Sequence, residues 1–462
     1  MIESPTKWQI KISNYFKLTE YNTNFRTEIL AGLTTFMTMA YILIVNPLIL
    51  SDGIFLNQPQ DLFSELVVAT AVSAGVGTII MALYANYPFG LAPGMGINAF
   101  FAYSVVLGLG IDWRLALAAV FVEGLIFIGL TLSNIRNQII KAIPMSLKSA
   151  TGAGIGLFIA YLGLGGNPET GGSGIIVSSP VTKTAFGSLT EPNTIVAIIG
   201  LFITIALVVR GVKGGLLWGI LATAILGWIL GITPPPQGLI EIPPFPTHLF
   251  AEGIKGVLQI RLDNLINFLA VLFVFLFVDM FDTIGTLAGV GMKAGFINAK
   301  GELPRANEAL LADAIATTVG AVMGTSSVTT YVESAAGVAE GGKTGLTALV
   351  VALLFFISLL FIPLLAAIPA YATAPTLIIV GVLMMSNVVY IRWNDLGESI
   401  PAFLTMFMIP LSFSIAEGLS IGFITYPLVK SCQGKAQEVP LATWILALVF
   451  VLRFTFMTLG FD

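Results

Sequence analysis

The stretch from Gly324 to Gly345 reads GTSSVTTYVESAAGVAEGGKTG and lies between two strongly apolar runs, at 310–323 and 346–365. Its β-branched first half, 327–332, favours an extended segment. Its second half, 333–339, favours a short helix that the glycines at 341 and 342 would end. A strand that leads into a half-helix cannot face lipid, because its backbone polar groups would lack partners there. The stretch therefore predicts a broken membrane crossing enclosed by protein, with the carboxylate of Glu333 at its junction, a layout typical of transporter sites.

Composition places the whole chain in a membrane. Of its 462 residues, 56% are hydrophobic and 10% are charged, whereas soluble domains carry about 25% charged residues. The lipid bilayer is therefore the expected environment. A net charge of −4 without a basic tract argues against nucleic acid as a partner. One cysteine, Cys432, and one histidine, His248, argue against a metal centre.

Apolar segments with short connections predict an all-α polytopic protein of about fourteen transmembrane segments. They lie at 28–50, 65–84, 97–110, 115–133, 149–165, 193–209, 214–232, 264–290, 307–323, 333–341, 346–366, 370–389, 400–416 and 418–430. The third and the tenth are too short to cross alone at about 1.5 Å per residue. Each follows an extended piece, at 90–96 and 325–332, that would complete the crossing. A further apolar stretch, 441–459, is either an additional crossing or a surface helix, and the sequence leaves both open.

Basic residues predict the orientation. With a cytoplasmic N-terminus, the cytoplasmic loops would carry most of the lysines and arginines, as the positive-inside rule requires. These are Arg136, Lys141, Lys148, Arg210, Lys213, Lys293, Lys300, Arg305, Lys343, Arg392, Lys430 and Lys435. The short outer loop 51–63 has none. We therefore expect a multi-pass protein of the cell membrane whose residues 1–27 lie in the cytoplasm.

A weak internal repeat relates the two halves. Ala142-Ile143-Pro144 precedes the fifth segment and Ala367-Ile368-Pro369 precedes the twelfth, and the third and tenth share the strand and half-helix pattern. Seven segments separate the members of each pair. Because seven is odd, the second half must be inverted relative to the first, which is the 7+7 inverted repeat of secondary transporters.

Asp279 and Asp282 are the first candidates for chemistry. They lie in FVDMFDTIGTL, at 277–287 of the eighth segment, and their i,i+3 spacing puts both carboxylates on one helix face. An acidic group at mid-membrane costs about 2.5–3.5 kcal/mol, so each one needs a reason. Two close carboxylates in a partly dry site readily hold a proton, which suits proton coupling. Alternatively, Asp282 bonds only to neighbouring backbone or hydroxyl groups.

The half-helices supply the other candidates. Glu333 begins the tenth, although Thr330 to Glu333 also matches a capping box in which Glu333 serves only its own helix. Asn98 begins the third, with a pure N-cap role as the alternative. We assign Thr330 to the binding site with Glu333, and Phe100 as an aromatic that could stack on a flat ligand, although most such aromatics are core residues.

Four other acidic residues receive a structural interpretation. Glu123 and Asp313 stand alone in apolar helices, and we expect them to be hydrogen-bonded packing groups. Glu340 and Glu417 fall at segment ends and would reach water. The predicted core contains no basic residue, which argues against an inorganic anion. A neutral planar molecule with several N–H donors suits the acidic acceptors, and nucleobases fit that description among others.

Five stretches carry a resemblance. They are FRTEILAGLTTFMTMAYILIVNP (25–47), APGMGINAFFAY (92–103), FVDMFDTIGTLAGV (277–290), GTSSVTTYVESAAGVAEGGKTGLTAL (324–349) and IPAYATAPTLIIVGVLMM (368–385). Through them the chain resembles the nucleobase–cation symporter-2 superfamily, specifically its AzgA-like purine permeases. The resemblance implies a uracil-permease-type fold with a core domain and a gate domain.

Domain limits follow from that likeness. The core would comprise 28–134 and 263–366, the gate 135–262 with the outer loops and 367–431, and 432–462 would be a C-terminal apolar segment. The resemblance implies proton-coupled uptake of adenine, guanine or hypoxanthine by alternating access, without a cofactor, and dimerisation through the gate. It places substrate contacts on Asn98, Asp279, Asp282 and Glu333. We assign proton coupling to Asp282, Asp279 and Glu333. The sequence leaves sodium open as the coupling ion.

Other functions fit less well. A uracil, xanthine or inorganic-anion carrier would share the fold and remains the main alternative. An intramembrane aspartyl protease would place its two carboxylates on facing helices, not three residues apart on one. A channel or a purely structural role does not explain charged mid-membrane groups within an inverted repeat.

Overall fold

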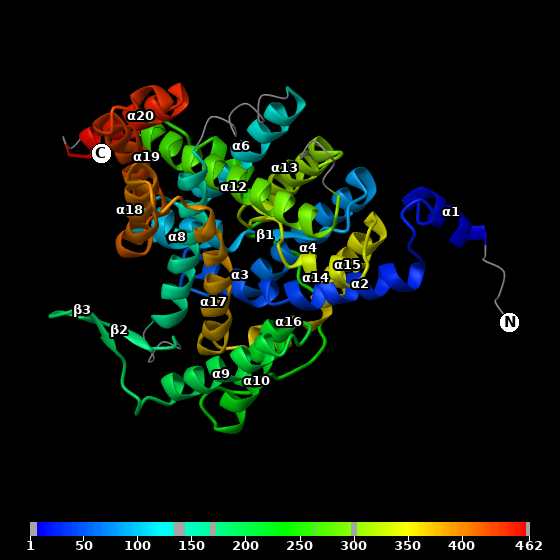
Figure 1. Ribbon diagram of the computed structural model, residues 1–462. Coiled ribbons are helices and arrows are strands. Elements are labelled where there is room, and N and C mark those ends of the chain that lie inside the picture. Colours follow the sequence, from blue (N-terminus) through cyan, green and yellow to red (C-terminus); the bar gives the residue numbers. More distant parts are fainter. Residues whose placement is uncertain (1–6, 134–143, 167–171, 263, 297–302, 459–462) are drawn as a thin grey trace.

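A computed structural model describes residues 7–133, 144–166, 172–262, 264–296 and 303–458 (Figure 1). Every one of the fourteen expected segments coincides with a helical element. The first half contains α1 (Lys7–Phe16), α2 (Phe25–Met39), α3 (Ile42–Ser51), α4 (Phe63–Ile80), α5 (Met95–Ala99), α6 (Trp113–Leu132), α8 (Met145–Leu164), α9 (Pro192–Val209) and α10 (Gly215–Ile229). Two π-helical turns, Met81–Ala85 and Phe100–Gly108, extend α4 and α5.

The second half begins after the short helix α11 (Glu252–Val257). It contains α12 (Leu265–Lys293), α13 (Ala306–Met323), α14 (Ser334–Ala339), α15 (Gly345–Ser358), α16 (Ile362–Ala366), α17 (Ala370–Met384), α18 (Leu396–Ser412), α19 (Ile415–Cys432) and α20 (Leu441–Thr458). Short 3-10 turns at Leu359–Phe361, Met385–Tyr390 and Ala436–Glu438 join some of them.

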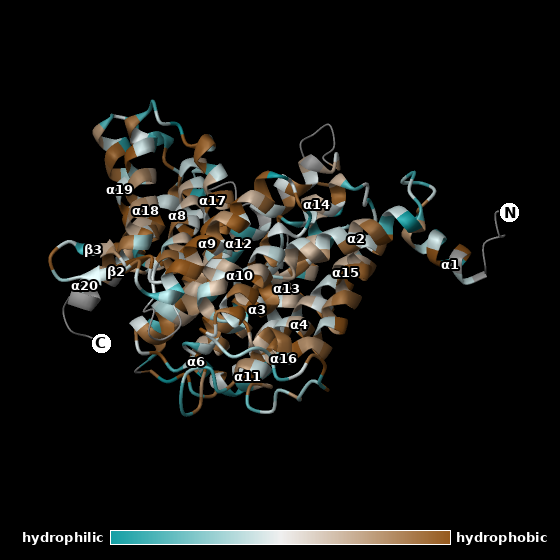
Figure 2. Cartoon of the chain, turned by 90° about the horizontal axis from the view of Figure 1, so that it is seen from below, coloured by the Kyte–Doolittle hydropathy of each residue, from teal (hydrophilic) through white to brown (hydrophobic). Residues whose placement is uncertain are grey.

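Within the described residues, eight helices are long and apolar enough to cross a membrane. Shorter apolar helices, among them Met95–Gly108 and Gly215–Ile229, accompany them. Hydrophobic residues cover these helices, whereas hydrophilic residues gather in the connections (Figure 2). The chain is thus a helical, multi-pass membrane protein, as composition predicts.

Two strands meet in the middle of the molecule. β1 (Leu91–Pro93) pairs with β4 (Val328–Thr330) in antiparallel register, with Leu91 opposite Thr330 and Pro93 opposite Val328. Both strands are fully buried. The helices α5 and α14 begin directly after them, so the predicted strand and half-helix pairs at 90–96 and 325–332 are confirmed. The strands can sit inside a membrane because each supplies hydrogen-bond partners to the other.

Threonines of two neighbouring helices satisfy the outer edges of this strand pair. The Leu91 N–H donates to Thr78 Oγ1 on α4 at 2.9 Å. The Val328 N–H donates to Thr317 Oγ1 on α13 at 3.2 Å. α4 and α13 are the second and ninth expected segments, so the two halves support their strands in the same way. This equivalence matches the predicted inverted repeat. Ala142 and Ile143, which belong to the repeated Ala-Ile-Pro sequence, lie outside the described residues.

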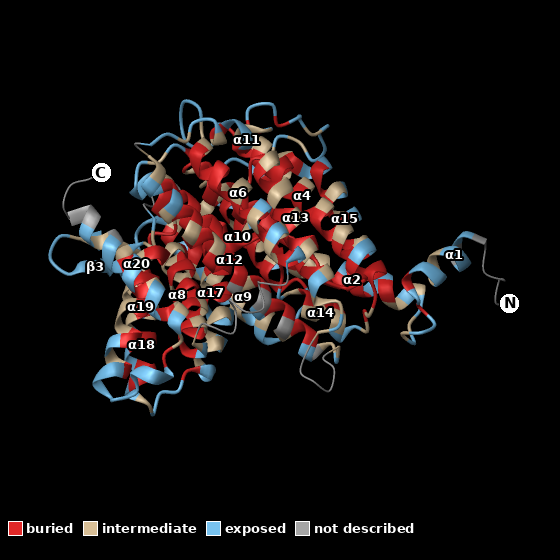
Figure 3. Cartoon of the chain, turned by 90° about the horizontal axis from the view of Figure 1, so that it is seen from above, coloured by how far each residue is buried: buried red, intermediate tan, exposed pale blue. Residues whose placement is uncertain are grey.

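The helices gather on two sides of the strand pair (Figure 1). In that view α8, α17, α18 and α19 lie to the left, and α2, α4, α14 and α15 lie to the right. Buried residues run through the helices of both sides and between them, whereas the connecting loops are exposed (Figure 3). Glycines allow close approach on the left side: a Cβ at Gly156 would lie 2.8 Å from the Gly381 carbonyl oxygen.

Three expected boundaries need correction. The first segment, 28–50, is interrupted at residues 40 and 41, between α2 and α3. The thirteenth and fourteenth segments, 400–416 and 418–430, begin earlier and meet at Phe413, whose φ is 53°. Ser414 then caps α19 by accepting the Glu417 N–H at 3.3 Å. Apolar runs alone do not reveal such turns, because hydropathy does not report backbone conformation.

The tail at 441–459 forms α20, described to residue 458, and packs on α19. Phe450 of α20 is buried and lies 5.8 Å, ring centre to ring centre, from Phe423 of α19 and 5.6 Å from Phe273 of α12. The opposite face of α20 is exposed, with Leu441 at 74% and Leu448 at 60% exposure. The helix therefore covers the α12–α19 seam with one face.

The linker between α10 and α12 is anchored by α11. Its glycines allow backbone contact: a Cβ at Gly256 would lie 2.1 Å from the Arg114 carbonyl oxygen of α6. Glu252 accepts a hydrogen bond from Arg114 Nε at 2.8 Å. The Pro-rich part of the linker, 232–246, precedes this anchor.

Replacing Gly256 with alanine should lower the thermal stability of the detergent-solubilised protein. The new methyl group meets backbone, which cannot swing away, and overpacking of this kind costs about 1–3 kcal/mol. Gly129→Ala on α6 is the matched control, because nothing lies within 4 Å of its Cβ position. Melting of both variants, followed by tryptophan fluorescence, checks this. Equal melting temperatures would contradict the anchoring of α11.

Candidate functional site

The starts of α5 and α14 and the middle of α12 converge beside the strand pair. A Cβ at Gly94, the residue before α5, would lie 3.6 Å from Asp282 Oδ2 of α12. Glu333 stands at the start of α14. Asp282 Oδ2 lies 3.4 Å from Thr329 Oγ1 of β4, and Glu333 follows the end of that strand by three residues. The predicted carboxylates of the eighth and tenth segments therefore lie at one place.

Glu333 does not form the capping box that its sequence context allowed. Thr330 lies in β4, and α14 begins at Ser334 without a side-chain cap. The Glu333 carboxylate instead accepts a hydrogen bond from the Tyr41 hydroxyl at 2.8 Å. The capping-box alternative is wrong because β4 extends through Thr330 and holds it away from the helix start.

Asp282 is half-buried and points at β4. Its Oδ2 lies 3.4 Å from Thr329 Oγ1, a long hydrogen bond. Asp279, one turn earlier on α12, is fully buried. Its Oδ1 lies 3.5 Å from Thr283 Oγ1, which also donates to Asp313 Oδ2 at 2.7 Å. The two aspartates share a helix, as predicted, but have different surroundings.

Asp313 and Glu123 hold the strand region together. Asp313 Oδ1 accepts the Thr330 N–H at 2.9 Å and the Thr330 hydroxyl at 3.3 Å. Glu123 Oε2 accepts the Ser327 hydroxyl at 2.7 Å. Both carboxylates are fully buried. These contacts are those of hydrogen-bonded packing groups, and they also occupy the hydroxyl of Thr330, which we had assigned to the binding site.

Asn98 lies one turn into α5 and is fully buried. Its Oδ1 accepts a hydrogen bond from Ser326. Its Nδ2 has no hydrogen-bond partner among the described residues. No side-chain cap is formed at the start of α5, so the pure N-cap alternative for Asn98 is wrong. A buried amide donor without a partner is costly unless something else accepts from it.

Phe100 lies away from these groups. It is 2% exposed and packs edge-on against Phe275 of α12, with ring centres 5.2 Å apart. Phe275 is one helical turn before Asp279. Phe100 therefore supports the helix that carries the aspartates, and its proposed stacking on a ligand would require a rearrangement.

The sequence prediction missed several residues. Tyr41 and Thr38 of the first segment reach Glu333, and Ser326 and Thr329 reach Asn98 and Asp282. Hydroxyl groups in an apolar run are the one signal that could have pointed to them. Their partners lie more than 200 residues away in some cases, so no local pattern links them.

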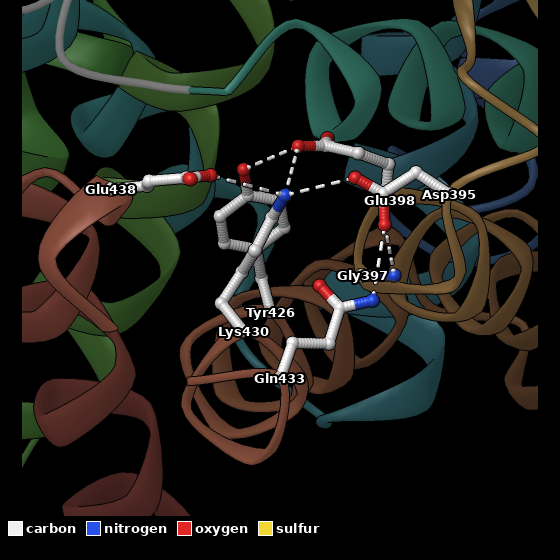
Figure 4. A network of polar contacts seen from close by, with 7 residues as sticks. All are labelled: Asp395, Gly397, Glu398, Tyr426, Lys430, Gln433 and Glu438. Carbon is white, nitrogen blue, oxygen red and sulfur yellow. Dashed lines mark hydrogen bonds and ion pairs between the residues drawn. The ribbon is translucent and has the colours of Figure 1, made fainter. Parts of the chain in front are cut away.

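A second polar cluster lies between the start of α18 and the end of α19 (Figure 4). Lys430, which we had placed in a loop, is 3% exposed and contacts Glu398 at 2.8 Å and Asp395 at 3.3 Å. The Tyr426 hydroxyl also donates to Glu398, at 2.9 Å. Hydrogen bonds from Gln433, together with those from Gly397 and Lys430, lower the pKa of Asp395 to about 2. The cluster ties two helices together far along the chain from the strand pair.

A cavity of about 290 Å³ adjoins this cluster. Its wall is formed by Pro144, Met145, Ser146, Tyr390, Arg392, Glu398 and Tyr426. None of the residues predicted for the binding site lines it. The cavity thus belongs to the α8–α18–α19 side of the molecule.

Comparison with known proteins identifies the chain. The model of a family described as the permease family matches residues 26–421. The chain belongs to this family, the nucleobase–cation symporter-2 family. Among its relatives, a putative permease of Methanocaldococcus jannaschii is 50% identical over 97% of this chain and 99% of its own length. The family consists of permeases and not of enzymes.

Two further relatives have more specific names. The guanine/hypoxanthine permease PbuG of Bacillus subtilis is 44% identical over 96% of this chain and all of its own length. The adenine permease AdeP of Escherichia coli is 40% identical over 98% of each chain. The resemblance to purine permeases is confirmed by these matches.

Solved structures confirm the fold. The transmembrane domain of the cyanobacterial bicarbonate transporter BicA superposes with a TM-score of 0.60, covering 86% of this chain and 97% of its own, at 16% identity. The anion transporter Slc26a9 of mouse gives 0.57 at 12% identity, covering 94% of this chain and 73% of its own. The uracil-permease-type fold predicted for the chain is the fold of these transporters.

Asp313→Asn and Asp282→Asn should separate structural from functional carboxylates. Asp313→Asn weakens three hydrogen bonds to a buried carboxylate, and we expect a loss of about 1–3 kcal/mol in stability. Asp282 makes one long hydrogen bond, so its replacement should leave the melting temperature nearly unchanged. Melting of the purified variants in detergent measures both. A larger loss for Asp282→Asn would reverse this assignment.

Proposed function

We propose that this protein is a proton-coupled symporter that imports purine nucleobases across the cell membrane, with its N-terminus in the cytoplasm. The observation that carries the proposal is that three polar groups lie along β4: Asn98 bonds to Ser326, Asp282 bonds to Thr329, and Glu333 follows the end of the strand. The names of the guanine/hypoxanthine and adenine permeases that align along nearly the whole chain support the substrate class.

The chemistry of these groups suits a purine. Carboxylates accept hydrogen bonds from ring N–H and exocyclic amino groups, and a carboxamide nitrogen donates to a ring nitrogen or a carbonyl oxygen. A purine presents donors and acceptors side by side on one planar edge. We assign substrate hydrogen bonds to Glu333, Asp279 and Asn98. Thr330 and Phe100 support the site without bonding to the substrate, because Thr330 contacts Asp313 and Phe100 contacts Phe275.

The coupling proton is assigned to Asp282, within a group that includes Asp279 and Glu333. Carboxylates that influence one another in a partly dry site bind a proton more readily than isolated ones in water. Protonation would also remove one negative charge before the site crosses the membrane. The half-buried position of Asp282 suits proton exchange with water better than that of the fully buried Asp279.

Alternating access would move the proposed core, 28–134 and 263–366, against the proposed gate, 135–262 and 367–431. Residues of the proposed core contact residues of the proposed gate, for example at two places. A Cβ at Gly96 of α5 would lie 2.3 Å from Ile155 Cγ2 of α8. Lys213 Nζ, beside α10, lies 2.6 Å from Glu340 Oε1 at the end of α14. Dimerisation through the gate helices is a further part of the proposal and follows from the family resemblance.

Uptake of radiolabelled hypoxanthine, guanine, adenine and uracil by permease-deficient cells tests the function. We expect purine uptake that collapses when a protonophore removes the proton gradient, and a loss of more than about tenfold in the Glu333→Gln variant. Glu417→Gln, at the start of α19, is the matched control and should transport normally.

Three outcomes would contradict the proposal. Uptake of uracil alone would indicate the alternative substrate class. Uptake that follows a sodium gradient and ignores the protonophore would refute proton coupling. Normal purine uptake by Glu333→Gln would refute the site.

Cross-linking across Lys213 and Glu340 tests the relative movement. Both residues would be changed to cysteine in a Cys432→Ser background, which removes the chain's one native thiol. A short bismaleimide should then stop uptake, whereas protein with Lys213→Cys alone should be unaffected by the reagent. Full uptake by completely cross-linked protein would show that these two positions do not move apart during transport.

A further inference from the structure

We propose that Tyr41 of the first segment is a positioning residue that holds the Glu333 carboxylate in its substrate-binding orientation. The inference rests on the proposed function and adds to it a residue that comes from a segment outside α5, α12 and α14. Tyr41 does not need to touch the substrate for this role.

The contact between the two residues is direct. Tyr41 is 1% exposed, and its hydroxyl donates to Glu333 Oε1 at 2.8 Å. Among the described residues, no other side chain donates a hydrogen bond to this carboxylate. The Tyr41 hydroxyl therefore holds one carboxylate oxygen, Oε1, and we assign the other, Oε2, to the ligand.

The first segment also contacts the backbone of Glu333. Thr38 Oγ1 lies 3.4 Å from the Glu333 carbonyl oxygen, although its shorter hydrogen bond, at 2.7 Å, is to the Thr35 carbonyl. Thr38 lies in the last turn of α2, and Tyr41 lies in the turn that follows α2. Adjacent positions of the first segment therefore contact both the side chain and the backbone of Glu333.

Tyr41 lies in the interruption between α2 and α3. The helix tightens there: the Leu43 N–H bonds to the Ala40 carbonyl and the Ile44 N–H bonds to the Tyr41 carbonyl, at 3.2 and 3.1 Å. A tightened turn of this kind often marks a functional position in a helix. Here it lies level with the start of α14, where Glu333 stands.

The hydrogen bond from Tyr41 reduces the rotamer freedom of the Glu333 side chain. A glutamate side chain at a helix start has several rotamers, and a ligand that binds one of them must bear the ordering cost. A hydrogen bond from a buried hydroxyl to a charged acceptor selects one rotamer in advance. Removing the hydroxyl should therefore weaken substrate binding while leaving the rate of the transport cycle at saturation nearly unchanged.

Tyr41→Phe is the decisive variant because it removes one oxygen atom and keeps the ring in the core. We expect the KM for hypoxanthine uptake and the Kd of the purified protein to rise about tenfold, with maximal rate and melting temperature nearly unchanged. Tyr371→Phe on α17 is the matched control. That tyrosine is equally buried, and its hydroxyl lies 3.0 Å from Thr233, away from the site.

A double variant separates positioning from general packing. If Tyr41 acts through Glu333, adding Tyr41→Phe to Glu333→Gln should raise the Kd no further than Glu333→Gln alone. An unchanged Kd in Tyr41→Phe, or a full additional loss in the double variant, would overturn the inference. Failure of the wild-type protein to bind any purine would instead refute the proposed function.

Discussion

The antiparallel pairing of β1 with β4 is the constraint on which the rest of this structure depends. Two three-residue strands expose backbone donors and acceptors in the middle of a membrane protein, where water is scarce. Each strand satisfies the other on one side, and Thr78 and Thr317 satisfy outer groups from α4 and α13. The strand pair therefore depends on the helices that pack on both of its sides.

That requirement sorts the buried carboxylates into two kinds. Asp313 and Glu123 accept hydrogen bonds from β4 and from the residue before it, and so belong to the support of the strand. Asp282 bonds to the Thr329 hydroxyl and Glu333 to the Tyr41 hydroxyl. Both are partly accessible, whereas Asp313 and Glu123 are fully buried, which is why the second kind carries the proposed chemistry.

The same fold serves different solutes. The bicarbonate transporter BicA shares the arrangement at 16% identity, whereas relatives named as purine permeases share 40–44% identity with this chain. The arrangement of helices alone therefore does not set the solute, and we assign that choice to the side chains at the strand crossing. An amide and carboxylates at half-helix starts suit a neutral ligand with N–H donors, and Tyr41 adds a fixed orientation to one of these carboxylates.

The sequence by itself determined the membrane environment, the fourteen helical segments and the strand with half-helix pattern around Asn98 and Glu333, because hydropathy and β-branched runs are local properties. It also selected Asp279, Asp282, Asn98 and Glu333, because polar groups are rare in apolar segments. Only the tertiary structure decided that Thr330 bonds to Asp313, that Phe100 packs on Phe275, and that Tyr41 meets Glu333. Those pairings join distant positions through the inverted packing of two halves, and no spacing along the chain encodes them.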